Sequence, residues 1–246
     1  MAIEDRLNEV RCLVQNGIEE RGVVRILQII GAPDFPLEIL TGMRLYSEYL
    51  PMAQELGFTN EQRYLHFLWD VLDRYPLGVV ANFAIPFRSI IANKLFKKCG
   101  KNFIAEEQVR FNYGQNIEVG DDVFFNRGVY LDSKGGIKIG NYVALTEGVQ
   151  VFTHGHSEDT HSKRDYNGVR ICDFAKVMVN ALLLPGVIIG EEALVAGCSV
   201  VNKDVPAGMM VAGSPARVVR ERRSRGKKGL ELDHIWLHEA AFQINS

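Results

Sequence analysis

Two histidines stand two residues apart in the stretch Phe152-Thr153-His154-Gly155-His156. The ordinary pKa of an imidazole, about 6.5, lets the ring accept a proton at neutral pH, so either histidine could act as a general base toward a hydroxyl. Residues two apart on a β-type segment point to the same side, which would bring both rings to one substrate. These two side chains are the first candidates for chemistry.

The elements that must position the histidines follow from a six-residue repeat. Aliphatic residues recur at this spacing after the histidines: Ile171, Val177, Leu183, Ile189, Val195 and Val201. Before them the spacing runs through Val119, Phe125 and Leu131 and, after a slip of two residues, through Ile139, Leu145 and Val151. The period fits neither an α-helix nor a simple alternating strand, and it is typical of a parallel β-helix. The histidines lie in the interruption between Val151 and Ile171.

Residues 1–100 are predicted to be an α-helical N-terminal region. The apolar stripe that begins with Ile3 and Leu7 indicates one helix, and Thr59 to Gln62 fits a capping box at the start of another. Pro86 suits the first turn of a further helix, and Gly100 suits its end.

Residues 101–215 are predicted to form the β-helix, with three hexads closing each coil and stacked strands about 4.8 Å apart. Residues 216–246 are expected to be a basic linker followed by a short C-terminal helix over Leu230–Phe242. A solenoid leaves an open strand edge at each end, and the two helical regions are natural covers for these edges.

The composition excludes several classes of partner. The net charge of −2 over 246 residues gives no global attraction to nucleic acid, and 47% hydrophobic content is ordinary for a globular protein. The chain holds no apolar run of about 18 residues, so we expect no integral membrane contact. Four scattered cysteines and acidic residues near the N-terminus favour a cytoplasmic location.

Three stretches give the chain a resemblance to a known family. They are Gly148–His156, Leu184–Gly190 and the pair Ser199–Pro206 and Ala212–Arg220. On these stretches the chain resembles the left-handed β-helix acyltransferases with hexapeptide repeats, in particular the maltose and galactoside O-acetyltransferases. The left hand of the helix comes from this resemblance alone, since general rules favour right-handed crossovers between parallel strands. The expected fold is therefore mainly β, a left-handed parallel β-helix.

The resemblance implies an acetyl-CoA-dependent O-acyltransferase that works as a homotrimer, with the active site between neighbouring β-helices. The acceptor implied is a hydroxyl of a sugar or of a saccharide-containing metabolite. His156 aligns with the family's general base in a Thr-x-x-His stretch, and a backbone N–H of a neighbouring coil would stabilise the oxyanion. His154 competes for the same role, or contacts the substrate.

The acceptor site implied by the resemblance includes Asn126, the first of a family asparagine pair whose second position is Gly128 here. Asn126 is equally well explained as a left-handed corner residue. Three charged residues of the interruption are further acceptor candidates, although such residues also keep ordinary loops soluble. They are Glu158, Asp159 and Arg164.

The coenzyme site implied by the resemblance has two parts. Lys203, Arg217 and Arg220 match positions near the coenzyme's phosphates, for which lysine and arginine are the expected partners. Small residues match the pantetheine arm, and Met178 stands where the family often carries a tryptophan; these positions are Met178, Ala181, Gly197 and Cys198. The repeat's own demand for small residues also explains Ala181. The stretch from Arg222 to Lys228 is expected to be a solvated basic linker.

Other functions stay open. An amino sugar is a possible acceptor, which would make the protein an N-acetyltransferase. γ-Class carbonic anhydrases share the β-helix, but a catalytic zinc needs three histidines converging from different coils. Here His154, His156 and His161 lie in one stretch and His234 and His238 in the tail, so we expect no metal. A non-catalytic binding scaffold is the remaining alternative.

Overall fold

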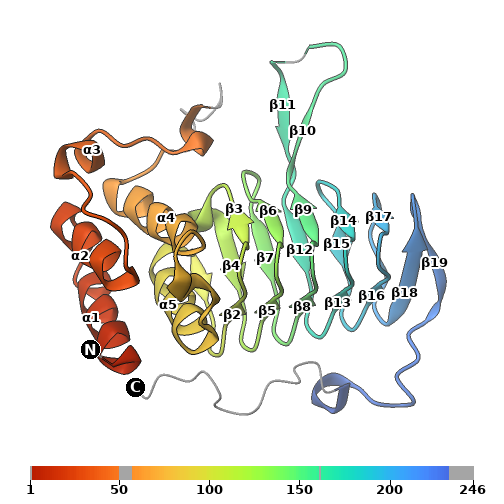
Figure 1. Ribbon diagram of the computed structural model, residues 1–246. Coiled ribbons are helices and arrows are strands. Elements are labelled where there is room, and N and C mark those ends of the chain that lie inside the picture. Colours follow the sequence, from red (N-terminus) through yellow and green to blue (C-terminus); the bar gives the residue numbers. More distant parts are fainter. Residues whose placement is uncertain (1, 50–56, 161, 233–246) are drawn as a thin grey trace. The chain divides into compact units, whose positions relative to one another are not determined.

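The computed structural model describes residues 2–49, 57–160 and 162–232, and these form two compact units. A helical unit ends at Phe96, and a β unit begins at Lys97. Figure 1 shows the elements of both units.

The helical unit consists of α-helices and short 3₁₀ helices. In chain order these are α1 (Ile3–Gln15), α2 (Glu20–Ile30), α3 (Leu37–Thr41), η1 (Tyr46–Tyr49), α4 (Asn60–Leu72), η3 (Pro76–Val79) and α5 (Ala81–Leu95). The predicted capping box at α4 is confirmed, because Gln62 N–H donates to Thr59 Oγ1 and Thr59 N–H donates to Gln62 Oε1. The predicted apolar stripe of α1 is also confirmed, with Leu7, Val10 and Val14 buried.

Two predictions about α5 are wrong. The helix begins at Ala81, so Pro86 lies inside it rather than in its first turn, and the helix ends at Leu95, well before Gly100. The proline costs one backbone hydrogen bond, which the burial of the surrounding apolar residues offsets. Gly100 instead occupies the first corner of the β unit, where a Cβ atom would lie 2.3 Å from the Gly120 carbonyl carbon.

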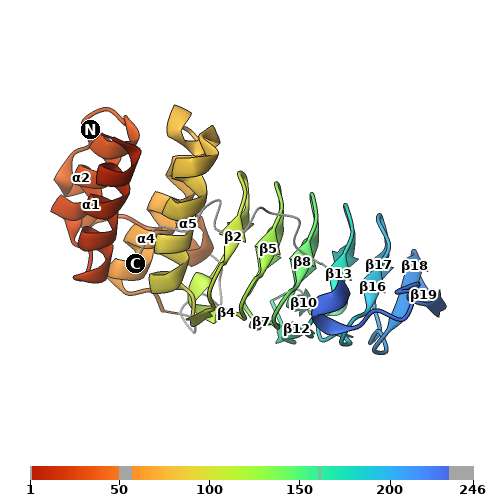
Figure 2. The same ribbon diagram turned by 90° about the horizontal axis from the view of Figure 1, so that it is seen from below.

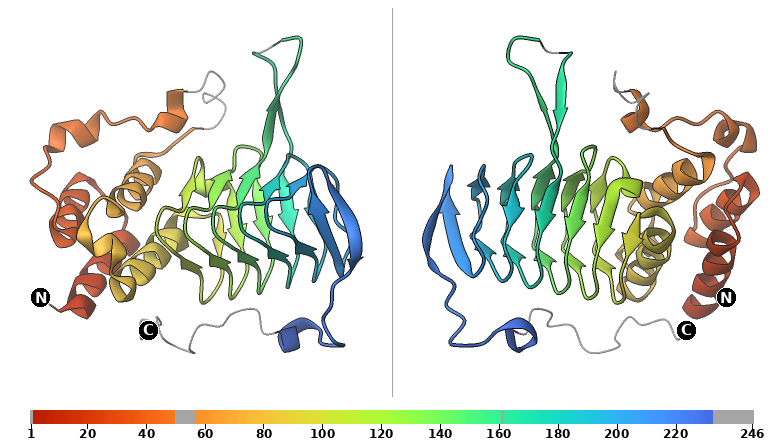
Figure 3. Two further views of the ribbon diagram at one scale, coloured as in Figure 1. Left: turned by 45° about the vertical axis from the view of Figure 1, so that its right-hand side comes forward. Right: turned by 180° about the vertical axis from the view of Figure 1, so that it is seen from behind.

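The β unit is a parallel β-helix whose coils contribute one strand to each of three sheets. The first sheet contains β1 (Lys98–Cys99), β4 (Ile117–Val119), β7 (Ile137–Ile139), β12 (Val169–Ile171) and β15 (Ile188–Ile189). The second contains β2 (Ile104–Ala105), β5 (Phe124–Phe125), β8 (Ala144–Leu145), β13 (Lys176–Val177), β16 (Leu194–Val195), β18 (Met209–Gly213) and the antiparallel β19 (Ala216–Glu221). The third contains β3 (Arg110–Phe111), β6 (Tyr130–Asp132), β9 (Gln150–Phe152), β14 (Leu182–Leu183) and β17 (Val200–Val201). Figures 2 and 3 show the strands stacked along one axis within this unit.

The register explains both the predicted hexads and the two-residue slip. In the last coils Lys176 pairs with Leu194, a step of 18 residues or three hexads, as predicted. In the first coils Tyr130 follows Arg110 and Gln150 follows Tyr130, a step of 20 residues. Across the interruption the step rises to 32, since Leu182 pairs with Gln150. Extra residues therefore leave the β-helix at corners and do not disturb the pairing of strands.

The inward positions of the hexads form a dry core. Leu131, Leu145, Val151 and Ile171 are fully buried, and so are the small fourth-position residues such as Ala175. Each buried aliphatic side chain contributes about 1.5–3 kcal/mol relative to its exposed state. Stacking these side chains coil on coil makes the hexad spacing a requirement of packing.

One corner column is built from glycines and short acidic or amide side chains. Asp121 N–H donates to Asn141 Oδ1 at 2.8 Å, and Asn141 N–H donates to Asp173 Oδ1 at 2.9 Å. Each of these side chains therefore accepts a hydrogen bond from a backbone N–H at the corner of the coil before it. The glycines leave room for these bonds. A Cβ atom on Gly140 would lie 2.8 Å from the Asp173 nitrogen.

The C-terminal part of the β unit differs from the expected linker. Residues 216–221 form β19, which turns back antiparallel on β18 and covers the edge of the second sheet. A 3₁₀ helix, η5 (Gly229–Leu232), follows. The predicted helix over Leu230–Phe242 lies mostly outside the described residues.

Replacing Gly140 with alanine is expected to destabilise the β unit by about 1–3 kcal/mol, because the added methyl group overpacks the corner against backbone atoms of Asp173. Gly155→Ala is the matched control, since a Cβ atom there meets nothing within 4 Å. Thermal unfolding of the two variants measures the difference. Equal melting temperatures would contradict the steric role of the glycine column.

Candidate active site

The interruption of the repeat is a β-hairpin that projects from the stack of coils (Figure 1). Its strands are β10 (His154–His156) and β11 (Arg164–Tyr166), which pair antiparallel with His154 opposite Tyr166 and His156 opposite Arg164. The hairpin leaves the β-helix at the corner between the third and first sheets. His161 lies outside the described residues.

A fully buried threonine fixes the neck of the hairpin. Thr153 Oγ1 donates to the Asp132 carbonyl oxygen at 2.6 Å and accepts from Gly135 N–H at 2.8 Å. Asn167 N–H, where the chain returns, donates to the Thr153 carbonyl oxygen at 2.8 Å. Glycine is required at position 135 beneath this neck, because a Cβ atom added to Gly135 would lie 2.5 Å from the Thr153 carbonyl oxygen.

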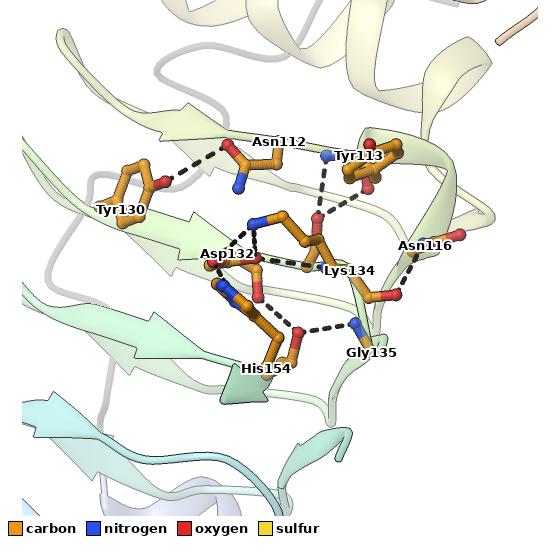
Figure 4. Close-up of polar contacts among 10 residues, drawn as sticks. Asn112, Tyr113, Asn116, Tyr130, Asp132, Lys134, Gly135 and His154 are labelled. Atoms are coloured by element: carbon orange, nitrogen blue, oxygen red, sulfur yellow. Dashed lines mark hydrogen bonds and ion pairs between the residues drawn. The ribbon is translucent and has the colours of Figure 1, made fainter. Parts of the chain in front are cut away.

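A buried ion pair lies directly beside the first histidine (Figure 4). Lys134 Nζ lies 2.9 Å and 2.8 Å from the two carboxylate oxygens of Asp132, and the exposed fractions of the two side chains are 5% and 2%. His154 Nδ1 lies 2.7 Å from Asp132 Oδ2, although the ring is not aligned for a hydrogen bond. The carboxylate therefore has cations or potential cations on two sides.

Burial lowers the pKa of His154 below its ordinary value. The positive charges of Lys134 and Arg164 and the neighbouring His156 lower it further, whereas the Asp132 carboxylate acts in the opposite direction. The imidazole of His154 is consequently neutral at neutral pH.

His156 has a different environment, because it is exposed on the hairpin while His154 is largely buried. The two ring centroids are 5.3 Å apart and the ring planes are inclined by 72°. One ring is thus set against the protein and the other is open to a ligand.

The predicted acceptor residues are only partly brought together. Glu158 and Asp159 are exposed beyond β10, and Arg164 is half-buried on β11, so all three share the hairpin with the histidines. Asn126 lies elsewhere, at the corner between the second and third sheets, where its Oδ1 accepts from Arg127 N–H at 2.7 Å. Asn126 does not have left-handed backbone angles; Gly128 has them, with φ of +72°.

The residues predicted for the pantetheine arm do lie together, at the corner between the second and third sheets. Met178 N–H donates to the Val195 carbonyl and Cys198 N–H to the Val179 carbonyl, which stacks the two corner segments in successive coils. Gly197 and Cys198 are exposed, whereas Ala181 is fully buried and packs inward. We call this corner, formed by residues 178–181 and 196–198, the coenzyme corner.

The basic residues predicted for the phosphates are spread more widely. Arg217 pairs with Ala212, one rung beyond the coenzyme corner, and Arg220 pairs with Met210 farther along β19. Lys203 is exposed on the opposite edge, between the third and first sheets, which is also the edge of the hairpin. The strands of the third sheet therefore separate the histidines from the coenzyme corner within one chain.

The expected solvated linker departs from prediction at Arg222. Its guanidinium donates to the carbonyl oxygens of Phe174 and Glu192 at 3.1 Å and 2.9 Å, and burial lowers its pKa. This contact holds the chain after β19 against two corners of the β-helix.

Sequence reasoning missed three residues of the site. Asp132 and Lys134 follow the inward Leu131 at the two-residue slip, and two charged residues at such a slip were the available signal. Thr146 is the third: its N–H donates to the Val177 carbonyl oxygen, one coil before the coenzyme corner, and its buried hydroxyl has no hydrogen-bond partner among the described residues.

Within the described part of the chain, no group of three histidine, cysteine or acidic residues could hold a metal ion. His234 and His238 lie outside it. None of the described helices has the length and apolar character needed to cross a membrane.

Curated proteins of similar sequence include acetyltransferases. The galactoside O-acetyltransferase of Escherichia coli K12 is 29% identical over 146 residues, which cover 57% of this chain and 71% of that protein. A provisionally named acetyltransferase of Dictyostelium discoideum is 30% identical over 179 residues, covering 70% and 88% of the two chains. No protein-family model matches the chain.

Solved structures show the same fold. A hexapeptide-repeat acetyltransferase of Vibrio cholerae has a TM-score of 0.56 at 28% identity, covering 65% of this chain and 92% of that one. The maltose O-acetyltransferase of Clostridium difficile has a TM-score of 0.61 at 25% identity, with 76% and 96% covered. A galactoside acetyltransferase in complex with coenzyme A has a TM-score of 0.61 at 21% identity, covering 87% and 100%, and shows the fold alone.

Replacing Thr153 with valine is expected to cost about 1–3 kcal/mol of unfolding free energy, because it leaves the Asp132 carbonyl and the Gly135 N–H buried without partners. Thr146→Val is the control, since it removes a buried hydroxyl that lacks a partner and should be neutral or stabilising. Urea unfolding of both variants tests the pair. A loss of similar size in both would show that the neck bonds do not hold the hairpin.

Proposed function

Since the chain belongs to the hexapeptide-repeat acetyltransferases, we propose that it moves an acetyl group from acetyl-CoA to a hydroxyl of a sugar or saccharide-containing acceptor. The observation that carries the proposal is the pair of histidines held on a hairpin by Thr153 and Asp132. The proposal has three parts: the base, the coenzyme site and the acceptor site.

His156 is the proposed general base. Its ring removes the hydroxyl proton of the acceptor while the oxygen attacks the thioester carbonyl carbon, the carbon–sulfur bond breaks, and the thiol leaves with the proton. Its exposure supports this role, because a base must reach a substrate. His154, which is neutral and largely buried, supports the base and contacts the acceptor from the same strand. A backbone N–H is the proposed donor to the oxyanion.

The coenzyme is proposed to lie along the coenzyme corner of one chain and to meet the histidines of a neighbouring chain in a homotrimer. The separation of the two edges by the third sheet supports a shared site, because one chain alone keeps its histidines away from residues 178–181 and 196–198. Head-to-tail contacts close into a ring of three where successive subunits are related by a rotation of one third of a turn. Arg217 and Arg220 of the chain that holds the coenzyme are the proposed partners of the phosphates, together with Lys203 from the hairpin edge of the neighbouring chain.

The acceptor is proposed to lie over the base of the hairpin. Tyr130 and Phe152 are half-buried on adjacent strands of the third sheet, with ring centroids 5.7 Å apart, and Phe152 is two residues from His154. Apolar ring faces beside polar side chains suit the mixed surface of a sugar. Glu158, Asp159 and Arg164 on the hairpin are proposed to bind its hydroxyls, and Asn126 those of an acceptor reaching the coenzyme corner.

Replacing His156 with alanine is expected to lower kcat by about 10²–10⁴-fold with little change in coenzyme affinity, because the ring acts only on the reacting proton. Release of free thiol from acetyl-CoA in the presence of a panel of sugars measures turnover, and calorimetry measures coenzyme binding. Activity that survives in H156A but is lost in H154A would move the role of base to His154.

Replacing Lys203 or Arg217 with alanine is expected to raise the KM for acetyl-CoA about tenfold and leave kcat nearly unchanged, since a phosphate contact acts equally in the ground and transition states. Lys227→Ala, at an exposed position of the tail, is the matched control. Steady-state kinetics separate the two constants. A fall in kcat at unchanged KM would rule out a phosphate contact.

A further inference from the structure

We propose that Lys134 is a positioning residue, which acts through Asp132 to hold the ring of His154 uncharged beside the base His156. This inference rests on the proposed function for its catalytic meaning, because it concerns the surroundings of the proposed base. Lys134 lies on a different coil from the hairpin, at the corner that follows β6.

The first step concerns the geometry and burial of the ion pair between Lys134 and Asp132. Lys134 Nζ contacts both carboxylate oxygens of Asp132, and both side chains are almost fully inaccessible to water. Removing two charges from water is costly, and apolar side chains of similar volume would stabilise the fold as well as a buried ion pair does. Stability alone therefore does not explain why this pair is here. Its place beneath the hairpin neck therefore points to a role in the site.

The second step is the charge that His154 meets. The groups facing its ring are Asp132, Lys134, His156 and Arg164, and Tyr166 lies opposite on β11. Asp132 is the only one of these groups that favours the charged form of the ring, and Lys134 already neutralises its carboxylate. Burial then keeps the ring neutral.

The third step is the effect on the base. His156 becomes an imidazolium as it takes the proton from the acceptor, and the centroid of the His154 ring is 5.3 Å away. A neutral ring permits this charge, whereas a charged ring would oppose it. Without Lys134, the carboxylate alone would raise the pKa of His154. At pH values below that raised pKa His154 would be charged, so the acid limb of the rate profile would move to higher pH.

The experiment is an NMR titration of histidine-labelled protein, which needs no turnover. In the unaltered protein His154 should titrate below the ordinary histidine range. In Lys134→Met, the pKa of His154 should rise by about one unit or more. The acid limb of kcat/KM should move with it, and the KM for acetyl-CoA should stay constant. Lys138→Met is the matched control, since Lys138 is exposed on the first sheet beside Glu118.

Two further variants keep the test decisive if Lys134→Met does not fold. Asp132→Asn removes the only group that favours the charged ring, so the pKa of His154 should fall further. The double variant with both substitutions replaces both members of the pair and should restore a low value. An unchanged titration of His154 in K134M or D132N, or an equal shift in K138M, would overturn the inference. Retained turnover in H156A would instead overturn the proposed base and leave the titration result standing.

Discussion

The short strands of the β-helix depend on hydrogen bonds between successive coils. Most strands have two or three residues, too few to be stable alone, and each strand between the ends of the stack is hydrogen-bonded to the coil before it and to the coil after it. A residue inserted within a strand would break this pairing and move inward side chains outward. Additional residues are therefore confined to corners, which is where the steps of 20 and 32 residues arise. The location of the histidines at a corner follows from this constraint.

In the candidate site, the neck of the hairpin is firmly anchored to the β-helix, whereas the histidine farther along the hairpin is exposed. Thr153 joins the hairpin to the preceding coil by two hydrogen bonds, and Gly135 provides the space for that contact. The histidine nearest the coil is buried against Asp132, and the next one along the strand is exposed. The chain thus controls the charge of one ring by burial and leaves the other ring accessible. An unanchored loop would not hold the first ring buried beside Asp132.

Local patterns allowed the parts that depend on one segment to be predicted from sequence. The hexad spacing predicted the parallel β-helix, and the Thr59–Gln62 pattern predicted the start of α4. Contacts between coils were not predictable in this way. Asp132, Lys134 and Thr153 meet because coils stack. Arg222 likewise donates to carbonyl oxygens of residues 30 and 48 positions earlier in the sequence. The helix α5 shows the same limit, since burial of its apolar residues overrides the local preference of Pro86 for a first turn.

The neck of the hairpin has a consequence for how such a protein can change over evolution. Thr153 and Asn167 close the excursion with one backbone hydrogen bond of 2.8 Å. The pairing of the β-helix strands therefore depends on the positions of these two residues and not on the length of chain between them. Residues 154–166 can consequently lengthen, shorten or change composition without altering strand register on either side. The hairpin residues proposed to bind the acceptor are then separate from the residues that stabilise the scaffold, so mutations in one group need not compromise the other.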